Sequence, residues 1–194
     1  MTHRDARFVR MAMEEAKKSS VCMQHGCIAV MHGKVIARSF NTACRASPTV
    51  WWSCHAEMGA IKKINEHQQQ TQKRCQRITL YIVRTTPHGE LHASAPCMHC
   101  TRAIQLCPCI KRIIYSESDG SIKRCSPDEY CTEHVSWGMR HGNLGSRKPS
   151  SFVAHLTCAA HGRYALTCDA FDILRQRERF GHNGSARRAV PWKP

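Results

Sequence analysis

Residues 77–100 read RITLYIVRTTPHGELHASAPCMHC, and this stretch holds a strand, a loop and the start of a helix. Residues 77–84 are rich in β-branched and aromatic side chains with little alternation, which is typical of a central strand covered on both faces. The loop of residues 85–95 then leads to Pro96, and proline suits the first helical position because its missing N–H needs no partner there. We therefore expect a helix from Pro96 to about Leu106, directly after a buried strand.

The rest of the first 136 residues carries alternating helical and strand patterns. Helical spacing covers residues 5–18 and 54–67, and a polar linker follows the second of these at 68–76. Between the two helices, a β-hairpin covers 26–41 around His32-Gly33. A second buried strand covers 111–116 and ends in a turn at 118–120. The residue types of Ser126-Pro127-Asp128-Glu129 are those of a helix start. The order α-β-β-α-β-α-β predicts an α/β fold with helices packed on a mixed sheet.

Length and charge limit the class of protein. The chain has 194 residues, with 29 Lys and Arg against 14 Asp and Glu, which gives a formal charge of +15. One ordinary domain plus an extension of about 50 residues fits this length. No apolar run approaches the roughly 20 residues that cross a bilayer, and the N-terminus lacks the apolar centre of a signal peptide. We expect an intracellular protein, cytoplasmic or nuclear, with no membrane partner. In a reducing compartment its 13 cysteines indicate metal ligation or burial rather than disulfides.

Basic charge is concentrated near the C-terminus. From Trp137 to the end there are ten basic residues against three acidic ones. The linker composition of residues 138–151 predicts a boundary between a main domain, residues 1–136, and a basic C-terminal extension, residues 137–194. We expect this extension to be partly ordered at most, with one helical stretch at residues 168–180. It is either a solvated tail or a contact surface for nucleic acid.

Two short motifs contain the residue types of a metal site, namely His-Ala-Glu at residues 55–57 and Pro-Cys-Met-His-Cys at residues 96–100. Zinc prefers nitrogen and thiolate ligands in tetrahedral geometry, and a catalytic zinc keeps three protein ligands and a water. His55, Cys97 and Cys100 supply that set. The two cysteines lie one helical turn apart, and a helix N-terminus favours thiolate over thiol. We predict one catalytic zinc ion at these three side chains.

Glu57 is the candidate catalytic residue. It lies two residues past His55, too far around the helix to be an equivalent ligand but able to reach water on the metal. The combined pattern H-x-E…P-C-x-x-C is the signature of zinc-dependent nucleobase deaminases. It predicts that zinc-bound hydroxide attacks C4 of cytosine or C6 of adenine, while Glu57 shuttles protons to the ring nitrogen and the departing ammonia.

By these residues the chain resembles the cytidine and deoxycytidylate deaminase superfamily, over roughly residues 5–120. The resemblance implies a hydrolase acting on C–N bonds of cyclic amidines. It also implies a cytidine-deaminase-like three-layer α-β-α sandwich with a mixed sheet of about five strands, and zinc at the N-termini of the two motif helices. The stretches LYIVRTTPHGELHASAPCMHC and IKRIIYSESDGSI look most like deaminase-like proteins of large DNA viruses and microbial eukaryotes. Relatives commonly pair through the sheet or the motif helices, so a homo-oligomer is one alternative.

The resemblance also implies a set of substrate-binding candidates, which are Ala29, Asn41, Arg45, Trp51, Trp52 and Ala56. Asn41 ends the second hairpin strand, where many relatives place an asparagine that contacts substrate, although a turn-forming asparagine is the alternative. At Ala29 a small side chain would let the nucleobase approach the backbone. Trp51 and Trp52 either stack on a base or pack on the core. Arg45 contacts either a phosphate or solvent.

The expected reaction is conversion of cytosine to uracil. The excess of basic over acidic residues and the aromatic side chains of Trp51 and Trp52 favour single-stranded DNA or RNA as the substrate, as in C-to-U editing. The alternatives are free cytidine or dCMP, tRNA adenosine, and a non-catalytic zinc-binding module that binds nucleic acid. Deaminases of tRNA adenosine usually carry Glu immediately before Pro-Cys, whereas Ala95 stands here, which disfavours adenosine. The intact Glu57 argues against a non-catalytic module.

Other cysteines and histidines leave alternatives open. Two sets of residues could each form a second, structural zinc site, but neither set has a standard spacing. The first set is His155, Cys158, His161 and Cys168, and the second is Cys125, Cys131 and His134. Cys107 and Cys109 are expected to pack as small apolar side chains. His99 is expected to have a structural role or to contact a metal ligand.

Overall fold

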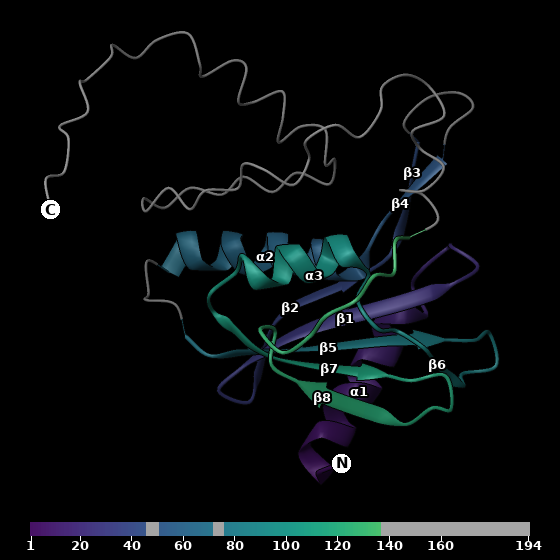
Figure 1. The fold of residues 1–194 in the computed structure, drawn as a ribbon, viewed down its shortest axis with the longest axis horizontal. Coiled ribbons are helices and arrows are strands. Elements are labelled where there is room, and N and C mark those ends of the chain that lie inside the picture. The colour runs from purple at the N-terminus through teal and green to yellow at the C-terminus, as the bar shows by residue number, and fades with distance from the viewer. Residues whose placement is uncertain (46–50, 72–75, 137–194) are drawn as a thin grey trace, which may run out of the picture.

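A mixed β-sheet forms the centre of the computed structural model, which describes residues 1–45, 51–71 and 76–136 (Figure 1). The elements in chain order are α1 (His3–Ala16), β1 (Gln24–Met31), β2 (Lys34–Phe40), β3 (Thr42–Arg45), β4 (Trp51–Cys54), α2 (Ala56–Thr71), β5 (Ile78–Thr85), β6 (Leu91–His92), α3 (Met98–Gln105), β7 (Ile110–Ser116) and β8 (Ile122–Cys125). The main sheet has six strands in the order β2-β1-β5-β7-β8, with β6 paired to β5. Only the β5–β7 pair is parallel among these described pairs, and β3 and β4 form a separate two-stranded sheet.

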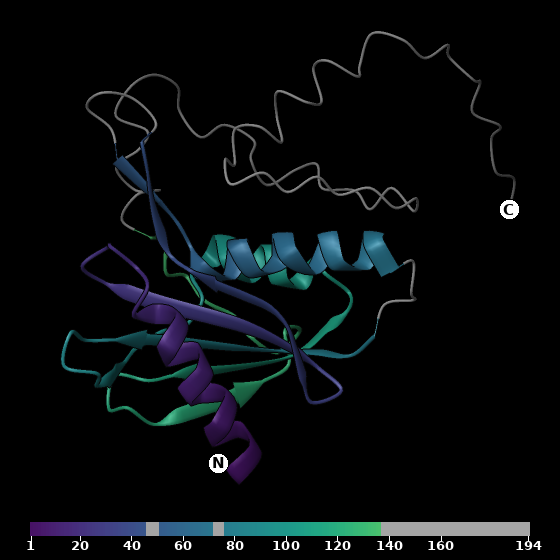
Figure 2. The same ribbon diagram turned by 180° about the vertical axis from the view of Figure 1, so that it is seen from behind.

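The helices lie on both faces of the sheet, with α1 on one face and α2 and α3 together on the other (Figures 1 and 2). Strand alternation supplies a core to each face, because successive side chains of a strand point in opposite directions. On β1, Ile28 and Val30 pack in the cluster around α1, whereas Cys27 and Ala29 pack in the cluster under α2. The predicted three-layer α/β fold is thus confirmed.

The predicted elements of the main sheet are present, but the sequence missed several short strands and one helix end. Strand β6 lies within the expected loop of residues 85–95, β8 follows the expected turn at residues 118–120, and no strand was expected at the positions of β3 and β4. The missed strands have two to four residues, too short to show a clear period. Helix α2 continues to Thr71, so the first residues of the predicted polar linker are helical.

The predicted helix at residues 126–129 is wrong, although its capping interactions form. The N–H of Glu129 donates to Ser126 Oγ at 3.3 Å, and the N–H of Ser126 donates to Glu129 Oε2 at 3.3 Å. These are the reciprocal bonds of a capping box, but only a turn follows. The buried Tyr130 instead directs the chain toward α3, since its hydroxyl donates to the carbonyl oxygen of Pro96 at 3.0 Å.

Some of the predicted features lie outside the described residues. These are residues 72–75 of the polar linker and the whole extension at residues 137–194, with its linker, its helix and its candidate second zinc site. In the part of the chain that the structure describes, no helix is long and apolar enough to cross a membrane.

Gly26 sets the distance between β1 and α1, and this generates a stability prediction. A Cβ there would collide with the carbonyl oxygen of Ala12 and lie 2.6 Å from the backbone nitrogen of Ala16. Because a helix backbone cannot yield cheaply, we expect Gly26→Ala to lower the free energy of unfolding by about 1–3 kcal/mol. Urea titration measures this change. The exposed Lys34→Ala should shift it by no more than about 0.5 kcal/mol, and an equal loss in both variants would contradict the prediction.

Candidate active site

The N-termini of α2 and α3 lie side by side over one end of the sheet (Figures 1 and 2). Helix α2 begins at Ala56, immediately after His55. Helix α3 begins at Met98, with Cys97 as its N-cap in extended backbone geometry, so Pro96 precedes the helix instead of opening it as predicted. The Cys97 side chain makes no capping hydrogen bond among the described residues. Its sulfur is therefore not used by the helix backbone.

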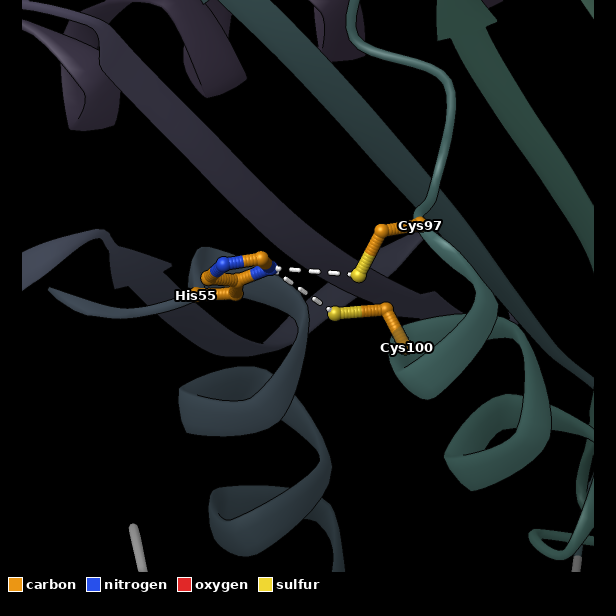
Figure 3. Close-up of side chains that lie close together, drawn as sticks. All are labelled: His55, Cys97 and Cys100. Carbon is orange, nitrogen blue, oxygen red and sulfur yellow. Dashed lines mark hydrogen bonds between the residues drawn. The ribbon is translucent and has the colours of Figure 1, made fainter. Parts of the chain in front are cut away.

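His55, Cys97 and Cys100 form one compact cluster (Figure 3). The Nδ1 atom of His55 lies 3.2 Å from Cys100 Sγ and 3.5 Å from Cys97 Sγ. All three ligand atoms lie within 4.8 Å of one another, and both cysteines are buried. The histidine therefore presents one ring nitrogen to two sulfurs that come from a different helix.

This geometry fits a zinc ion. With Zn–N near 2.0–2.1 Å and Zn–S near 2.3 Å, a tetrahedral site places nitrogen and sulfur about 3.6 Å apart, close to the two separations observed. Within residues 1–45, 51–71 and 76–136, no other group of three His, Cys, Asp or Glu side chains is this close. Cys125, Cys131 and His134 therefore do not form the second site considered above.

The protonation of the cluster matches its geometry. A hydrogen bond with Cys97 raises the pKa of His55 to about 9 against the opposing effect of burial. Hydrogen bonds from Cys100 and His55 hold the pKa of the Cys97 thiol far below its usual value. The pKa of Cys100 is raised by its hydrogen bond to Cys97, by burial and by the charge of Glu57. The lowered pKa of Cys97 favours its thiolate, which is the form that a zinc ligand requires.

Glu57 lies beside this cluster, in the first turn of α2, as the sequence predicted. It is only 4% exposed. Its negative charge acts on the pKa values of Cys27, His55 and Cys100, so the carboxylate is close to all three. Glu57 is not one of the three clustered ligands, and its side chain shares a hydrogen bond with Cys100.

The predicted substrate-binding residues lie in three kinds of position: in the core, in contact with backbone, or with side chains that the structure does not describe. Ala29 and Ala56 are fully buried in the core between the sheet and α2. Asn41 is also buried, and its side chain binds backbone: Oδ1 accepts from the N–H of His25 at 2.8 Å, and Nδ2 donates to the carbonyl oxygen of Met23 at 2.8 Å. Asn41 therefore fixes the start of β1. The backbones of Arg45, Trp51 and Trp52 pair within β3 and β4, but their side chains lie outside the described part.

His25 and Cys27 were missed by the sequence analysis. They lie on the face of β1 that carries Ala29, two residues apart along the strand, and the charge of Glu57 acts on both. Burial lowers the pKa of His25, and its Nδ1 lies 3.1 Å from the carbonyl oxygen of Met23. Since Ala29 was expected to face the site, the period of two along a strand could have identified both.

Comparison with known proteins agrees with this geometry. Residues 2–117 match the family model described as the cytidine and deoxycytidylate deaminase zinc-binding region. No curated protein matched the sequence. Among solved structures, cytidine deaminase from Burkholderia pseudomallei is 18% identical, with a TM-score of 0.48 over 70% of this chain and 100% of that one. The dCMP deaminase of cyanophage S-TIM5 is 18% identical, with a TM-score of 0.42 over 61% of this chain and 86% of that one.

A zinc-binding deaminase is the class that the fold and the cluster define together. The family match covers more than half of the chain, so this protein belongs to the cytidine and deoxycytidylate deaminase family. The zinc-binding region of that family and the His/Cys/Cys cluster are both consistent with one zinc ion.

Metal content tests the cluster directly. We expect purified protein to contain about one zinc per chain and Cys100→Ser to lose most of it, because a hydroxyl is a poorer ligand for zinc than a thiolate. Elemental analysis by mass spectrometry gives the stoichiometry. The exposed Cys22→Ser is the matched control and should keep its zinc. Stoichiometric zinc in Cys100→Ser would show that the metal lies elsewhere.

Proposed function

We propose that this protein is a zinc-dependent hydrolytic deaminase that converts cytosine to uracil. The observation that carries the proposal is the buried carboxylate of Glu57 beside the cluster of His55, Cys97 and Cys100. A structural zinc site has no need of a buried carboxylate that is not a ligand, and burying a charge is costly without a partner. The proposed ligands are these three side chains, and Glu57 is the proposed general acid and base.

The proposed reaction adds water to C4 of the ring and releases ammonia. Zinc, when bound, lowers the pKa of a coordinated water from 15.7 to about 7 and so supplies a nucleophile at neutral pH. Glu57 accepts a proton from the attacking water and delivers it to the ring nitrogen N3. It then moves the proton of the new C4 hydroxyl to the amino group, so that the C4–N bond breaks, ammonia departs and a carbonyl remains at C4. The buried position of Glu57 beside the metal ligands supports this role.

We further propose single-stranded nucleic acid as the substrate. The formal charge of +15 supports this, because Lys and Arg contacts to phosphates supply most non-specific binding to nucleic acid. The second candidate is free cytidine or dCMP, which the description of the matched family favours. The two candidates share the chemistry of the site and differ in what surrounds it.

A substitution of Glu57 tests the reaction. We expect Glu57→Gln to lower the deamination rate by about 100- to 10,000-fold, because the amide cannot accept the proton, while the zinc content and thermal stability stay near those of the parent protein. Uracil formation from cytidine, dCMP and single-stranded oligonucleotides is measured by chromatography. The exposed Glu66→Gln, on the same helix, is the control. Full activity in Glu57→Gln would contradict the proposed role.

Removal of residues 137–194 tests the substrate. We expect this truncation to weaken binding to single-stranded oligonucleotides and to flatten its salt dependence, because ten basic residues are lost. Fluorescence anisotropy at several salt concentrations gives the slope. Turnover of dCMP by the truncated protein checks that the site is intact. Unchanged binding would show that the extension is only solvated, and deamination of mononucleotides alone would favour the second candidate.

A further inference from the structure

One arginine and two histidines form a row across the sheet next to the metal cluster. His25 on β1 pairs directly with Arg84 on β5, and Arg84 pairs with His92 on β6. Directly paired residues point to the same face of a sheet. Ile78, Leu80 and Ile82 of β5 pack under α2 and α3, so the alternation along β5 places Arg84 on that face. The row therefore faces the side of the sheet that carries the active site.

Arg84 has no anionic partner in this row. It is half-buried, and within residues 1–45, 51–71 and 76–136 its guanidinium makes neither an ion pair nor a hydrogen bond. The positive charge of Arg84 instead lowers the pKa of His25. The charge of His55 also lowers this pKa, and the charge of Glu57 raises it. A half-buried guanidinium beside imidazoles, without a carboxylate of its own, is an arrangement that an anion would stabilise.

The spacing suits one phosphate group. Directly paired residues have Cβ atoms about 4.5–5.5 Å apart, so the three side chains can reach oxygens of the same phosphate. Along β1 the row lies two residues, about 7 Å, from Cys27, which is close to the carboxylate of Glu57. A nucleotide with its base at Glu57 would carry its phosphate one sugar away, a separation comparable to that between Cys27 and this row.

We propose that His25, Arg84 and His92 form a subsite for the phosphate group of the substrate, with Arg84 as the principal ligand. This assignment rests on the proposed function and deepens it, since it predicts a nucleotide and not a nucleoside as the substrate. Arginine donates two parallel hydrogen bonds to phosphate, and the imidazoles add further donors on either side. The phosphate belongs either to a nucleoside monophosphate or to the backbone of a strand.

Binding of reaction products separates the subsite from the chemistry. Titration calorimetry on the zinc-loaded full-length protein compares uridine with UMP, neither of which is turned over. We expect UMP to bind about 10- to 100-fold more tightly than uridine, and Arg84→Gln to remove most of this difference. Arg112→Gln is the matched control, because Arg112 pairs with Thr79 on the neighbouring strand and lies on the α1 face, near Tyr81. It should keep the full preference for UMP.

Two further measurements complete the test. Arg84→Lys keeps the charge but not the paired donors, so its preference for UMP should lie between those of the parent and Arg84→Gln. A single-stranded oligonucleotide with one internal deoxyuridine distinguishes the two sources of phosphate. If Arg84→Gln loses affinity for the strand but not for UMP, the row binds a backbone phosphate. If it loses affinity for UMP but not for the strand, the row binds the phosphate of a mononucleotide.

The outcomes distinguish this subsite from the proposed function. A preference for phosphate that depends on Arg84, in a protein that deaminates no cytosine compound, would support the subsite and overturn the proposed reaction. Deamination with a preference that is the same in Arg84→Gln and in the parent would overturn the subsite and leave the reaction standing. Equal binding of uridine and UMP, together with strand binding that does not depend on Arg84, would also overturn the subsite.

Discussion

The meeting of two helix N-termini over one end of the sheet is the constraint on which the site depends. His55 precedes α2 and the two cysteines open α3, so the ligand atoms can meet only where the sheet holds both helices side by side. Parallel pairing of β5 with β7 requires a crossover connection, and α3 lies in that crossover. The same arrangement places free backbone N–H groups, which favour anions, around a cluster that needs a thiolate. The fold therefore both brings the three ligand atoms together and supplies the local electrostatics that favour a thiolate.

The central features could be predicted from sequence because their signals are local and strong. The strand at residues 78–85 and the hairpin around His32 have clear apolar runs, and the spacing of Cys97 and Cys100 is set by one helical turn. The metal ligands follow from residue type and spacing alone. Glu57 also follows, because its position relative to His55 is fixed by the first turn of α2.

Features that depend on pairing between distant segments could not be predicted in the same way. Strands β3, β6 and β8 have at most four residues and are defined by their partners more than by their own sequences. The capping pattern at residues 126–129 is satisfied without a helix, because the buried Tyr130 binds the backbone beside α3. The contacts of Asn41 also join distant segments, because both polar atoms of its side chain bind the backbone at the start of β1.

The segment after Tyr130, residues 131–136, is the last described part of the chain. Its carbonyl oxygen at His134 accepts the N–H of Met98 at 2.8 Å, in the first turn of the helix that carries Cys100. The last described residues therefore lie beside the first turn of α3, close to the metal cluster. The N–H of Met98 is one of the amides that a helix leaves without an internal partner at its N-terminus, so the start of α3 depends on a segment that lies far along the chain.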